Sequence, residues 1–362
     1  MVPDFRWLFK KIKEKKMKKL MVLVAALALV AASAMTAAAA DWNFYGSARV
    51  ATFYVDQDFD SDKSIGDLLD NDNTSYEQAL NGNSRIGANV KVSDELTGGF
   101  EYGTGANVRK LFGEWNFGAG SLLVGQTYTP LNMFYSNQVY AADNDLLAQG
   151  GVYSGRDAMI RLKFGDFQIA AIAPDTSAIA GLAGTETDFP AIEARYLLTM
   201  DAFQAQLAGG YQTYEIGGLD VDSWVVALGG KADFGAVYMG GNVFTGENAG
   251  NLMAVSVDGD NAWDDGFAVY DAVNNKIEDN DVLGFMVAAG FKANDMLAFE
   301  IGYGWAETDV ANVENEVQAY YVQSTITLAP GVFITPEIGM FDGVETGSQE
   351  TLYYGAKWQI NF

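Results

Sequence analysis

The sequence contains no cysteine and no histidine among its 362 residues. Without these residues the chain cannot form disulfides, thiolate nucleophiles or Cys/His zinc sites. The absence of imidazole also excludes Ser-His-Asp hydrolysis and every related mechanism that uses a histidine base. A carboxylate-only enzyme is the catalytic class that is left, and no motif supports it. We therefore expect no enzyme activity, no metal site and no cofactor.

Basic residues are scarce. The chain has 22 Lys and Arg against 47 Asp and Glu. Residues 1–40 carry 8 of the basic and 2 of the acidic residues, which leaves 14 basic and 45 acidic residues and a net charge of −31 for residues 41–362. Such a charge repels nucleic acid, so we expect no nucleic-acid partner.

The N-terminal 40 residues have the pattern of a secretory signal peptide. Lys18 and Lys19 precede an apolar run at 20–32, and small residues at 38–40 stand directly before Asp41. A basic start, a short apolar stretch and an A-x-A site are the parts of such a peptide. We predict that residues 1–40 are cleaved. Met17 offers a second start, which would make residues 1–16 an upstream extension, and a retained anchor helix is the alternative.

The remainder lacks any apolar run of 18 residues and has only six prolines, with 40 glycines and 13% aromatic residues. Short segments alternate between apolar and small or polar residues, as strands with two different faces do. In the last segment Leu352, Tyr354, Ala356, Trp358, Ile360 and Phe362 share one face. Similar alternation recurs at 86–92, 160–164, 203–212 and 297–305.

Two kinds of connection alternate along the chain. Tight turns are predicted at 93–98, 118–120, 165–166, 201–202, 232–235, 293–295 and 329–331. Acidic loops, of which only the second is short, are predicted at 56–80, 104–106, 130–154, 175–188, 215–222, 246–281, 308–316 and 342–350. Fifteen connections join sixteen strands. The predicted fold class is all-β, a single transmembrane antiparallel β-barrel at 41–362 with short periplasmic turns, long extracellular loops and an aqueous lumen.

Several segments resemble the trimeric general porins of Gram-negative bacteria. They are Asn43–Arg49, Ser84–Gly87, Asp94–Leu96, Gly98–Phe100, Phe117–Gln126 and the terminal Phe362. The best-matching stretch covers about residues 41–165, and the rest is similar mainly in layout and in the last strand. The resemblance implies a homotrimer with one pore per subunit, placed in the outer membrane among lipid and lipopolysaccharide.

The resemblance also implies roles for particular segments. The terminal strand, with Tyr354, Trp358, Ile360 and Phe362, is expected to be the signal for the barrel-assembly machinery. The third external loop, at 130–154, is expected to fold inward and present Asp143 and Asp145 to the pore. The family's Pro-Glu-Phe-Gly-Gly motif is absent from this loop.

All six arginines after residue 40 fall between positions 49 and 195. Parity places most of them on polar strand faces, and the pore-lining candidates are Arg49, Arg85, Lys91, Arg161, Lys163 and Arg195. Arg109 departs from the pattern because it shares the parity of Leu111 and Trp115. Two interpretations stay open: the arginines set ion selectivity, or they balance lumenal carboxylates such as Glu193 and stiffen the wall.

The function expected from these observations is passive diffusion of ions and small hydrophilic solutes, with a weak cation preference from the net charge. One alternative is a substrate-specific channel for small anionic solutes, and another is a surface adhesin without a channel. The spacing of Asp56, Asp58, Asp60, Asp62 and Asp67 is reminiscent of a calcium loop, but Ser61 stands where that loop needs glycine. We expect a solvated acidic loop there.

Overall fold

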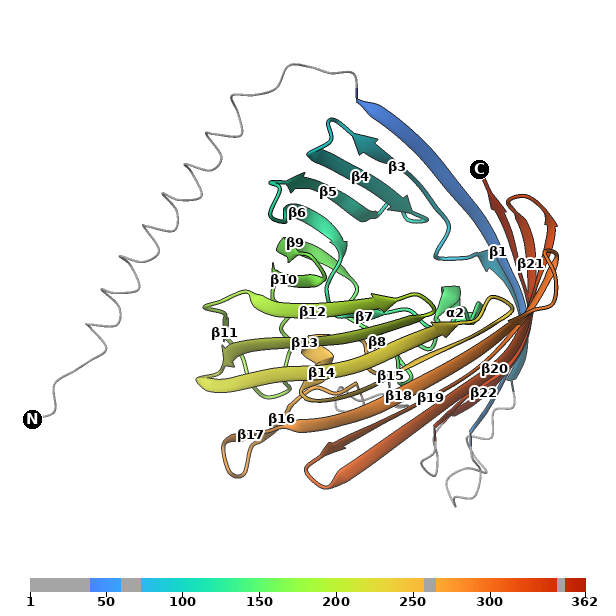
Figure 1. Ribbon diagram of the computed structural model, residues 1–362. Helices are drawn as coiled ribbons and strands as arrows, with labels where there is room; N and C mark the ends of the chain where they lie inside the picture. The colour runs from blue at the N-terminus through green and yellow to red at the C-terminus, as the bar shows by residue number, and fades with distance from the viewer. Residues whose placement is uncertain (1–39, 60–72, 257–264, 344–348) are drawn as a thin grey trace, which may run out of the picture. The chain divides into compact units, whose positions relative to one another are not determined.

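The computed structural model describes residues 40–59, 73–256, 265–343 and 349–362, and residues 42–362 form one compact unit. Its main sheet is antiparallel throughout, and the last strand, β22, pairs back onto the first, β1, to close a barrel (Figure 1). The predicted signal peptide, up to residue 39, lies outside the described residues. No helix in the described part of the chain is long and apolar enough to cross a membrane.

The barrel has sixteen strands when β2 and β3 are counted as one interrupted strand, which confirms the predicted fold class. The strands are β1 (Asp41–Phe59), β2 (Asn73–Leu80), β3 (Arg85–Lys91), β4 (Leu96–Gly103), β5 (Val108–Asn116), β6 (Ser121–Tyr128), β9 (Arg156–Phe164), β10 (Phe167–Ile172), β12 (Ala191–Met200), β13 (Phe203–Ile216), β14 (Leu219–Asp233), β15 (Val237–Glu247), β18 (Asn280–Lys292), β19 (Leu297–Val310), β20 (Val313–Ala329), β21 (Val332–Gly343) and β22 (Gln349–Asn361).

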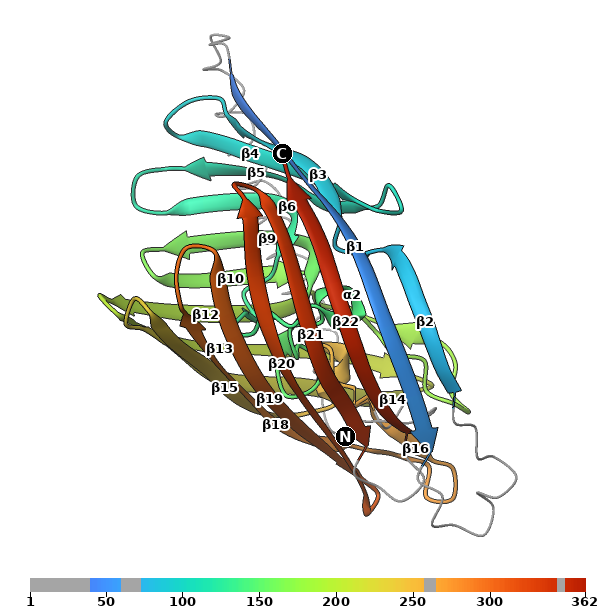
Figure 2. The same cartoon turned by 90° about the vertical axis from the view of Figure 1, so that its right-hand side faces the viewer.

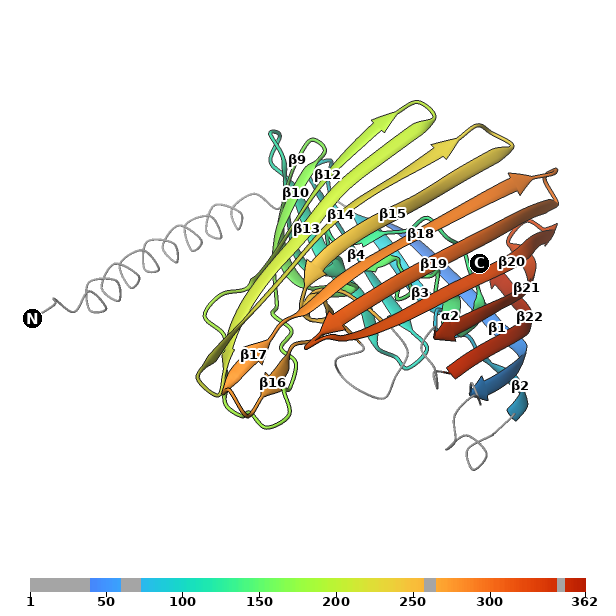
Figure 3. The same ribbon diagram turned by 90° about the horizontal axis from the view of Figure 1, so that it is seen from below.

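Shorter elements lie in the loops. They are β7 (Asn132–Met133) with β8 (Val152–Tyr153), the single turn α2 (Tyr140–Asp143), β11 (Thr185–Glu186), the 3-10 turn η2 (Ala249–Asn251) and the hairpin β16 (Val269–Asp271) with β17 (Lys276–Glu278). Tight turns join the strands at one end of the barrel, and the β16–β17 hairpin lies at the other end (Figure 3). Turns and loops therefore separate to opposite ends, as the alternation of connections predicts.

The two faces of each strand differ as the alternation predicts. On β22, Tyr354, Trp358 and Ile360 are about half exposed on the outside, whereas Tyr353, directly before Tyr354, is completely buried inside. The same pattern of exposed large apolar residues continues around the outer wall, for example at Leu228 and Ile301. An apolar outer face suits the hydrocarbon of a bilayer. The inner face also carries apolar residues, because loops pack against it.

Two of the predicted acidic loops, at 215–222 and 308–316, are instead two-residue hairpin turns. The strands continue to Gly217–Gly218 in the first case and to Ala311–Asn312 in the second. All four turn residues have positive φ, between 53° and 83°. Positive φ at both central residues is the geometry of tight hairpins, so the acidic residues beside these turns belong to the strands.

The first predicted loop is also shorter than expected, because β1 extends to Phe59 and β2 begins at Asn73. Asp60, Asp62 and Asp67, the later members of the acidic series, lie outside the described residues. The second barrel strand is then interrupted at 81–84, where the Asn81 carbonyl accepts a hydrogen bond from the Ser84 amide. Figure 2 shows β2 and β3 following one another along β1. This interruption leaves room on the inner wall for the tip of the third external loop.

Three external loops shape the interior, and we name them loop 3 (129–155), loop 4 (173–190) and loop 6 (248–279). Loop 3 enters the barrel between β6 and β9, and α2 at its tip lies inside the barrel near β1 (Figure 1). The largest buried apolar cluster contains residues from loop 3, loop 6 and the inner wall, among them Leu131, Met133, Leu252 and Phe244. The core of this protein is therefore inside the barrel and lies along one side of it.

The barrel closes at its terminal residue. The amide and carbonyl of Phe362 exchange hydrogen bonds of 3.0 and 2.7 Å with Gly46 of β1. The Phe362 ring covers Gly46 so closely that a Cβ there would lie 2.5 Å from the ring. A side chain at position 46 would therefore displace the Phe362 ring, and glycine lets the ring lie over the strand.

Deletion of Phe362 should lower the fraction of chain recovered from membranes as a folded barrel, because the closing pair is lost. Heat-modifiable migration on gels measures that fraction. Phe362→Tyr, which keeps the ring and the backbone, should assemble like the wild type. Normal assembly of the deleted chain would show that closure does not need this residue.

Candidate functional site

Loop 3 lies on a row of glycines in the inner wall. A Cβ at Gly229 of β14 would lie 2.7 Å from the Met133 sulfur and from the Tyr135 ring, and one at Gly240 of β15 would lie 3.1 Å from Tyr135. On β13, a Cβ at Gly210 would lie 3.4 Å from Leu131. Absence of side chains at these wall positions lets the loop backbone approach the sheet. All three belong to Gly-Gly pairs, at 209–210, 229–230 and 240–241, which the sequence alone shows.

Three buried wall glutamates hold the backbone of loop 3. Glu193 of β12 accepts a 2.8 Å hydrogen bond from the Leu131 amide and a 2.5 Å bond from the Ser154 hydroxyl. Glu300 of β19 accepts from the Asn137 amide at 2.8 Å. Glu337 of β21 accepts from the amides of Val139 and Tyr140 at 2.7 and 2.9 Å. Bonds from backbone amides to carboxylates are charge-assisted and strong, so the loop is fixed at successive points around the wall.

Aromatic contacts fix the far part of the loop. The Tyr140 ring stacks on Tyr353 of β22 with centroids 3.9 Å apart, and it meets Phe53 of β1 edge-on at 5.2 Å. Tyr353 also accepts a 2.7 Å hydrogen bond from the Gln138 side chain. Stacked and edge-on rings add to the stabilisation from area burial. Loop 3 therefore crosses the interior from β6 to the seam between β1 and β22.

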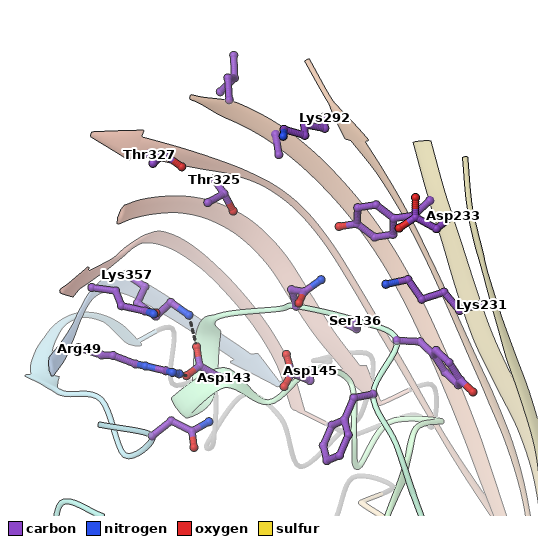
Figure 4. Close-up of a pocket in the computed structure, with 18 of the residues that line it drawn as sticks. Arg49, Ser136, Asp143, Asp145, Lys231, Asp233, Lys292, Thr325, Thr327 and Lys357 are labelled. Atoms are coloured by element: carbon purple, nitrogen blue, oxygen red, sulfur yellow. Dashed lines mark hydrogen bonds and ion pairs between the residues drawn. The ribbon is translucent and has the colours of Figure 1, made fainter. Parts of the chain in front are cut away.

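At the loop tip, Asp143 lies between two wall cations. Its carboxylate oxygens are 2.5 Å from the Arg49 guanidinium of β1 and 2.5 Å from the Lys357 ammonium of β22 (Figure 4). All three side chains are nearly buried. Asp143 and four non-glycine neighbours between 141 and 146 have positive φ. Each such residue costs on the order of 1 kcal/mol or more, so the ion pairs hold a strained turn in place.

Loop 6 packs over loop 3 from the other side. The amides of Ala254 and Ser256 donate to the carbonyls of Tyr153 and Ala148 at 2.8 and 3.0 Å. Leu252 and Met253 are buried in the same cluster. The strand pattern does not predict this inward fold of loop 6. The apolar run at 252–255 is too short to stand out inside a long acidic loop.

The opposite inner wall carries a cluster of cations around one carboxylate. Glu101 of β4 is almost completely buried, and Arg85, Arg109 and Lys110 lie 3.7, 2.8 and 3.6 Å from its carboxylate oxygens. A β-bulge between β4 and β5 shifts the register here, so that Glu101 pairs with Lys110 and Tyr102 with Val108. The bulge turns Arg109 inward, which corrects the sequence-derived parity that grouped Arg109 with Leu111 and Trp115.

Farther along the same wall lie Arg161 of β9 and Arg195 of β12. Arg161 is 3.9 Å from Glu114 of β5, a loose contact. Arg195 forms no ion pair with any described residue. Glu193, the carboxylate that the sequence offered as a balancing partner for such arginines, is used by loop 3 instead. This wall therefore holds more positive than negative charge.

A cavity of about 900 Å³ lies where the loop tip faces the wall (Figure 4). Arg49, Arg85, Asp143 and Asp145 line it, together with Lys357. Burial, and next the Asp143 charge, raise the pKa of the Asp145 carboxyl well above its usual range, and the Lys357 charge opposes this shift. Among the described residues, Asp145 forms no ion pair, unlike Asp143.

The structure thus brings four of the predicted pore-lining residues to one cavity and leaves others outside it. Arg161 and Arg195 line a second, neighbouring cavity. Lys91 lies at the turn end, 2.7 Å from Asp94, and Lys163 is exposed beside the turn at 165–166. The sequence reasoning missed Lys357, Arg109, Lys110 and Glu101, although the parity of β22 places Lys357 on its polar face. No three acidic, His or Cys side chains in the described ranges are grouped to hold a metal ion.

Asp143→Asn should leave the Arg49 and Lys357 charges buried without their partner. Breaking a buried ion pair in this way costs about 3–5 kcal/mol, and we expect a loss of this order in the free energy of unfolding, with larger fluctuations of single-channel current as the loop tip loosens. Asp94→Asn removes a carboxylate from the exposed pair with Lys91 and is the matched control, with no change expected. Equal behaviour of the two variants would refute a structural role for Asp143.

Solved structures with similar folds are outer-membrane proteins. The channel DcaP of Acinetobacter baumannii superposes with a TM-score of 0.72 at 18% identity, covering 91% of this chain and 100% of that one. The Salmonella typhi OmpF complex with daunomycin gives 0.58 at 15%, covering 88% and 97%. The trimer form of OmpT from Vibrio cholerae gives 0.56 at 15%, covering 90% and 100%. These likenesses support the sixteen-stranded barrel fold.

The sequence comparisons agree with the fold. No curated protein matches the chain. A family model described as Gram-negative porin matches residues 25–346, most of the sequence. Porins are channel proteins of the outer membrane rather than enzymes, and passive diffusion of solutes through the barrel follows from this fold and family. The chain belongs to the Gram-negative porin family.

Proposed function

We propose that this outer-membrane diffusion channel prefers small anions, because its narrowest part lies between loop 3 and the basic wall. The observation that carries the proposal is the excess of positive charge on that wall. Seven cations point inward from β1, β3, β5, β9, β12 and β22, and three carboxylates contact them. The cations are Arg49, Arg85, Arg109, Lys110, Arg161, Arg195 and Lys357, and the carboxylates are Glu101, Glu114 and Asp143.

The net charge of the chain favours cations instead, which is the expectation from the sequence alone. Much of that negative charge lies in external loops, where it is exposed to salt. Screening reduces such charges over about 10 Å at 0.1 M ionic strength, whereas partly buried charges are screened much less. A charged ring in the narrow part of a pore sets the sign of the ions that pass. The wall cations should therefore outweigh the loops except at low salt.

The proposal includes a homotrimer. Strands β3–β6, β9 and β10 have six to nine residues, whereas a membrane-spanning strand needs about 9–11. Contact with other copies of the chain would cover the side of the barrel that these short strands form. The trimer form of the similar OmpT structure supports the same assembly.

We also propose export through a cleaved signal peptide and insertion by the barrel-assembly machinery. What supports cleavage after Ala40 is that β1 begins at Asp41, next to the A-x-A site. What supports recognition of the terminal strand is its aromatic outer face and its closing pair with β1. Once inserted, the apolar outer wall would contact outer-membrane lipid, and the external loops would contact lipopolysaccharide.

The double variant Arg85→Ser/Arg161→Ser should shift ion selectivity toward cations, because two wall charges are removed. The reversal potential of the detergent-purified protein in a planar bilayer under a salt gradient measures the shift. Lys276→Ser, on the exposed β16–β17 hairpin, is the control and should leave the potential nearly unchanged. A cation-preferring wild type, or an unchanged potential in the double variant, would contradict the proposal.

Asp145 should make the selectivity depend on pH. Its carboxyl is neutral below its raised pKa and becomes an anion as the pH rises through that value, which adds negative charge to the cavity. Besides Lys357, the charged groups that act on it are Asp143, Glu300 and Glu337. We expect anion preference to fall with rising pH above the ordinary carboxyl range near about 4. Asp145→Asn should flatten this part of the profile, and identical profiles would contradict the assignment.

A further inference from the structure

A second cavity, of about 380 Å³, lies between the start of loop 3 and the wall formed by β5, β6, β9, β12 and β13. Two guanidiniums, Arg161 and Arg195, line it together with the side chains of Phe112, Leu123, Phe134 and Tyr135. Phe134 and Tyr135 also line the larger cavity at the loop tip. The smaller cavity therefore opens beside the diffusion path.

Three buried donors in this cavity have no protein acceptor. They are Nε of Arg161, Nε of Arg195 and the hydroxyl of Tyr135, and none of them reaches a hydrogen-bond partner in the described ranges. Buried polar groups are nearly always hydrogen-bonded, since an unsatisfied one costs about 1–3 kcal/mol. These three atoms have almost no exposed surface themselves, so an entering acceptor would meet the terminal nitrogens of the two guanidiniums, whose side chains line the cavity.

The charge and protonation of the donors define the chemistry of that acceptor. Arg195 has no carboxylate partner among the described residues, and the contact of Arg161 with Glu114 is loose at 3.9 Å. Burial raises the pKa of Tyr135 to about 12 although the Arg195 charge opposes the shift, so the hydroxyl remains a donor at neutral pH. Glu114 also lines the cavity, so two guanidiniums against one carboxylate leave a net positive charge, which favours an oxyanion.

We propose that this cavity is a binding site for a small carboxylate with a short apolar body, which pauses there during passage. The planar guanidinium fork matches a carboxylate, and the rings of Phe112 and Phe134 offer apolar surface to the rest of the solute. The volume is at the small end of ligand sites, which span about 300–1,000 Å³. This inference rests on the proposed anion preference and adds saturable binding to it.

The test compares benzoate with neutral benzamide as blockers of single-channel chloride current in the purified protein. We expect benzoate to block saturably and benzamide not to block. Arg195→Gln should raise the half-blocking concentration at least tenfold. Lys276→Gln makes the same charge change on the distant hairpin and should leave it unchanged.

The outcomes separate binding from general electrostatics. Linear, unsaturable effects of benzoate would overturn the site while leaving the proposed anion preference intact, since that preference is read from the reversal potential. Equal weakening of benzoate block by Arg195→Gln and Lys276→Gln would also overturn the proposed site. Inorganic phosphate is the third probe: block by phosphate as strong as by benzoate would remove the apolar contribution and overturn the assigned ligand class.

Discussion

Everything inside this barrel depends on how the backbone of loop 3 satisfies its hydrogen bonds. A segment that runs along a sheet wall cannot pair with strands whose backbone groups already bond one another, so its amides need side-chain acceptors. Glu193, Glu300 and Glu337 provide them from three different parts of the wall, each no more than 4% exposed. Glycines on the strands between them let the loop lie close. Without these partners the loop would leave buried amides unpaired and would not stay against the inner wall.

A loop held to one side makes the pore asymmetric. Its apolar residues pack into the largest core cluster, against wall residues of the strands from β6 to β20. The cavity at the loop tip is lined by residues of β1, β3 and β22, and on its other side by residues of β14, β15 and β18–β20. The Asp143 contact with Arg49 and Lys357 joins the two halves at the loop tip. The Asp143 carboxylate on the loop side and the Arg49 and Lys357 cations on the wall side are thus positioned by the same contacts.

The alternation of faces and connections was enough to predict the strand number and the direction of each face, because a strand repeats every two residues regardless of its partners. It also placed Arg49 and Arg85 on the inner face, whereas Asp143 and Asp145 entered the hypothesis only through the resemblance to the general porins. It failed where local geometry departs from that period: the β4–β5 bulge reverses Arg109, and positive φ turns shorten two predicted loops. The loop anchors could not be predicted, because no pattern in a single strand says that Glu300 or Glu337 will meet an amide some 160 or more residues away in the sequence.

The most direct test of this account is amide hydrogen exchange of loop 3 in the folded wild type and in Glu300→Ala/Glu337→Ala. If the wall glutamates hold loop 3, we expect amides 137–140 to exchange as slowly as strand amides in the wild type. In the double variant these amides should exchange rapidly, while the strands of the barrel stay protected. Rapid exchange of this segment in the wild type, or slow exchange in the variant, would show that the wall glutamates do not hold the loop.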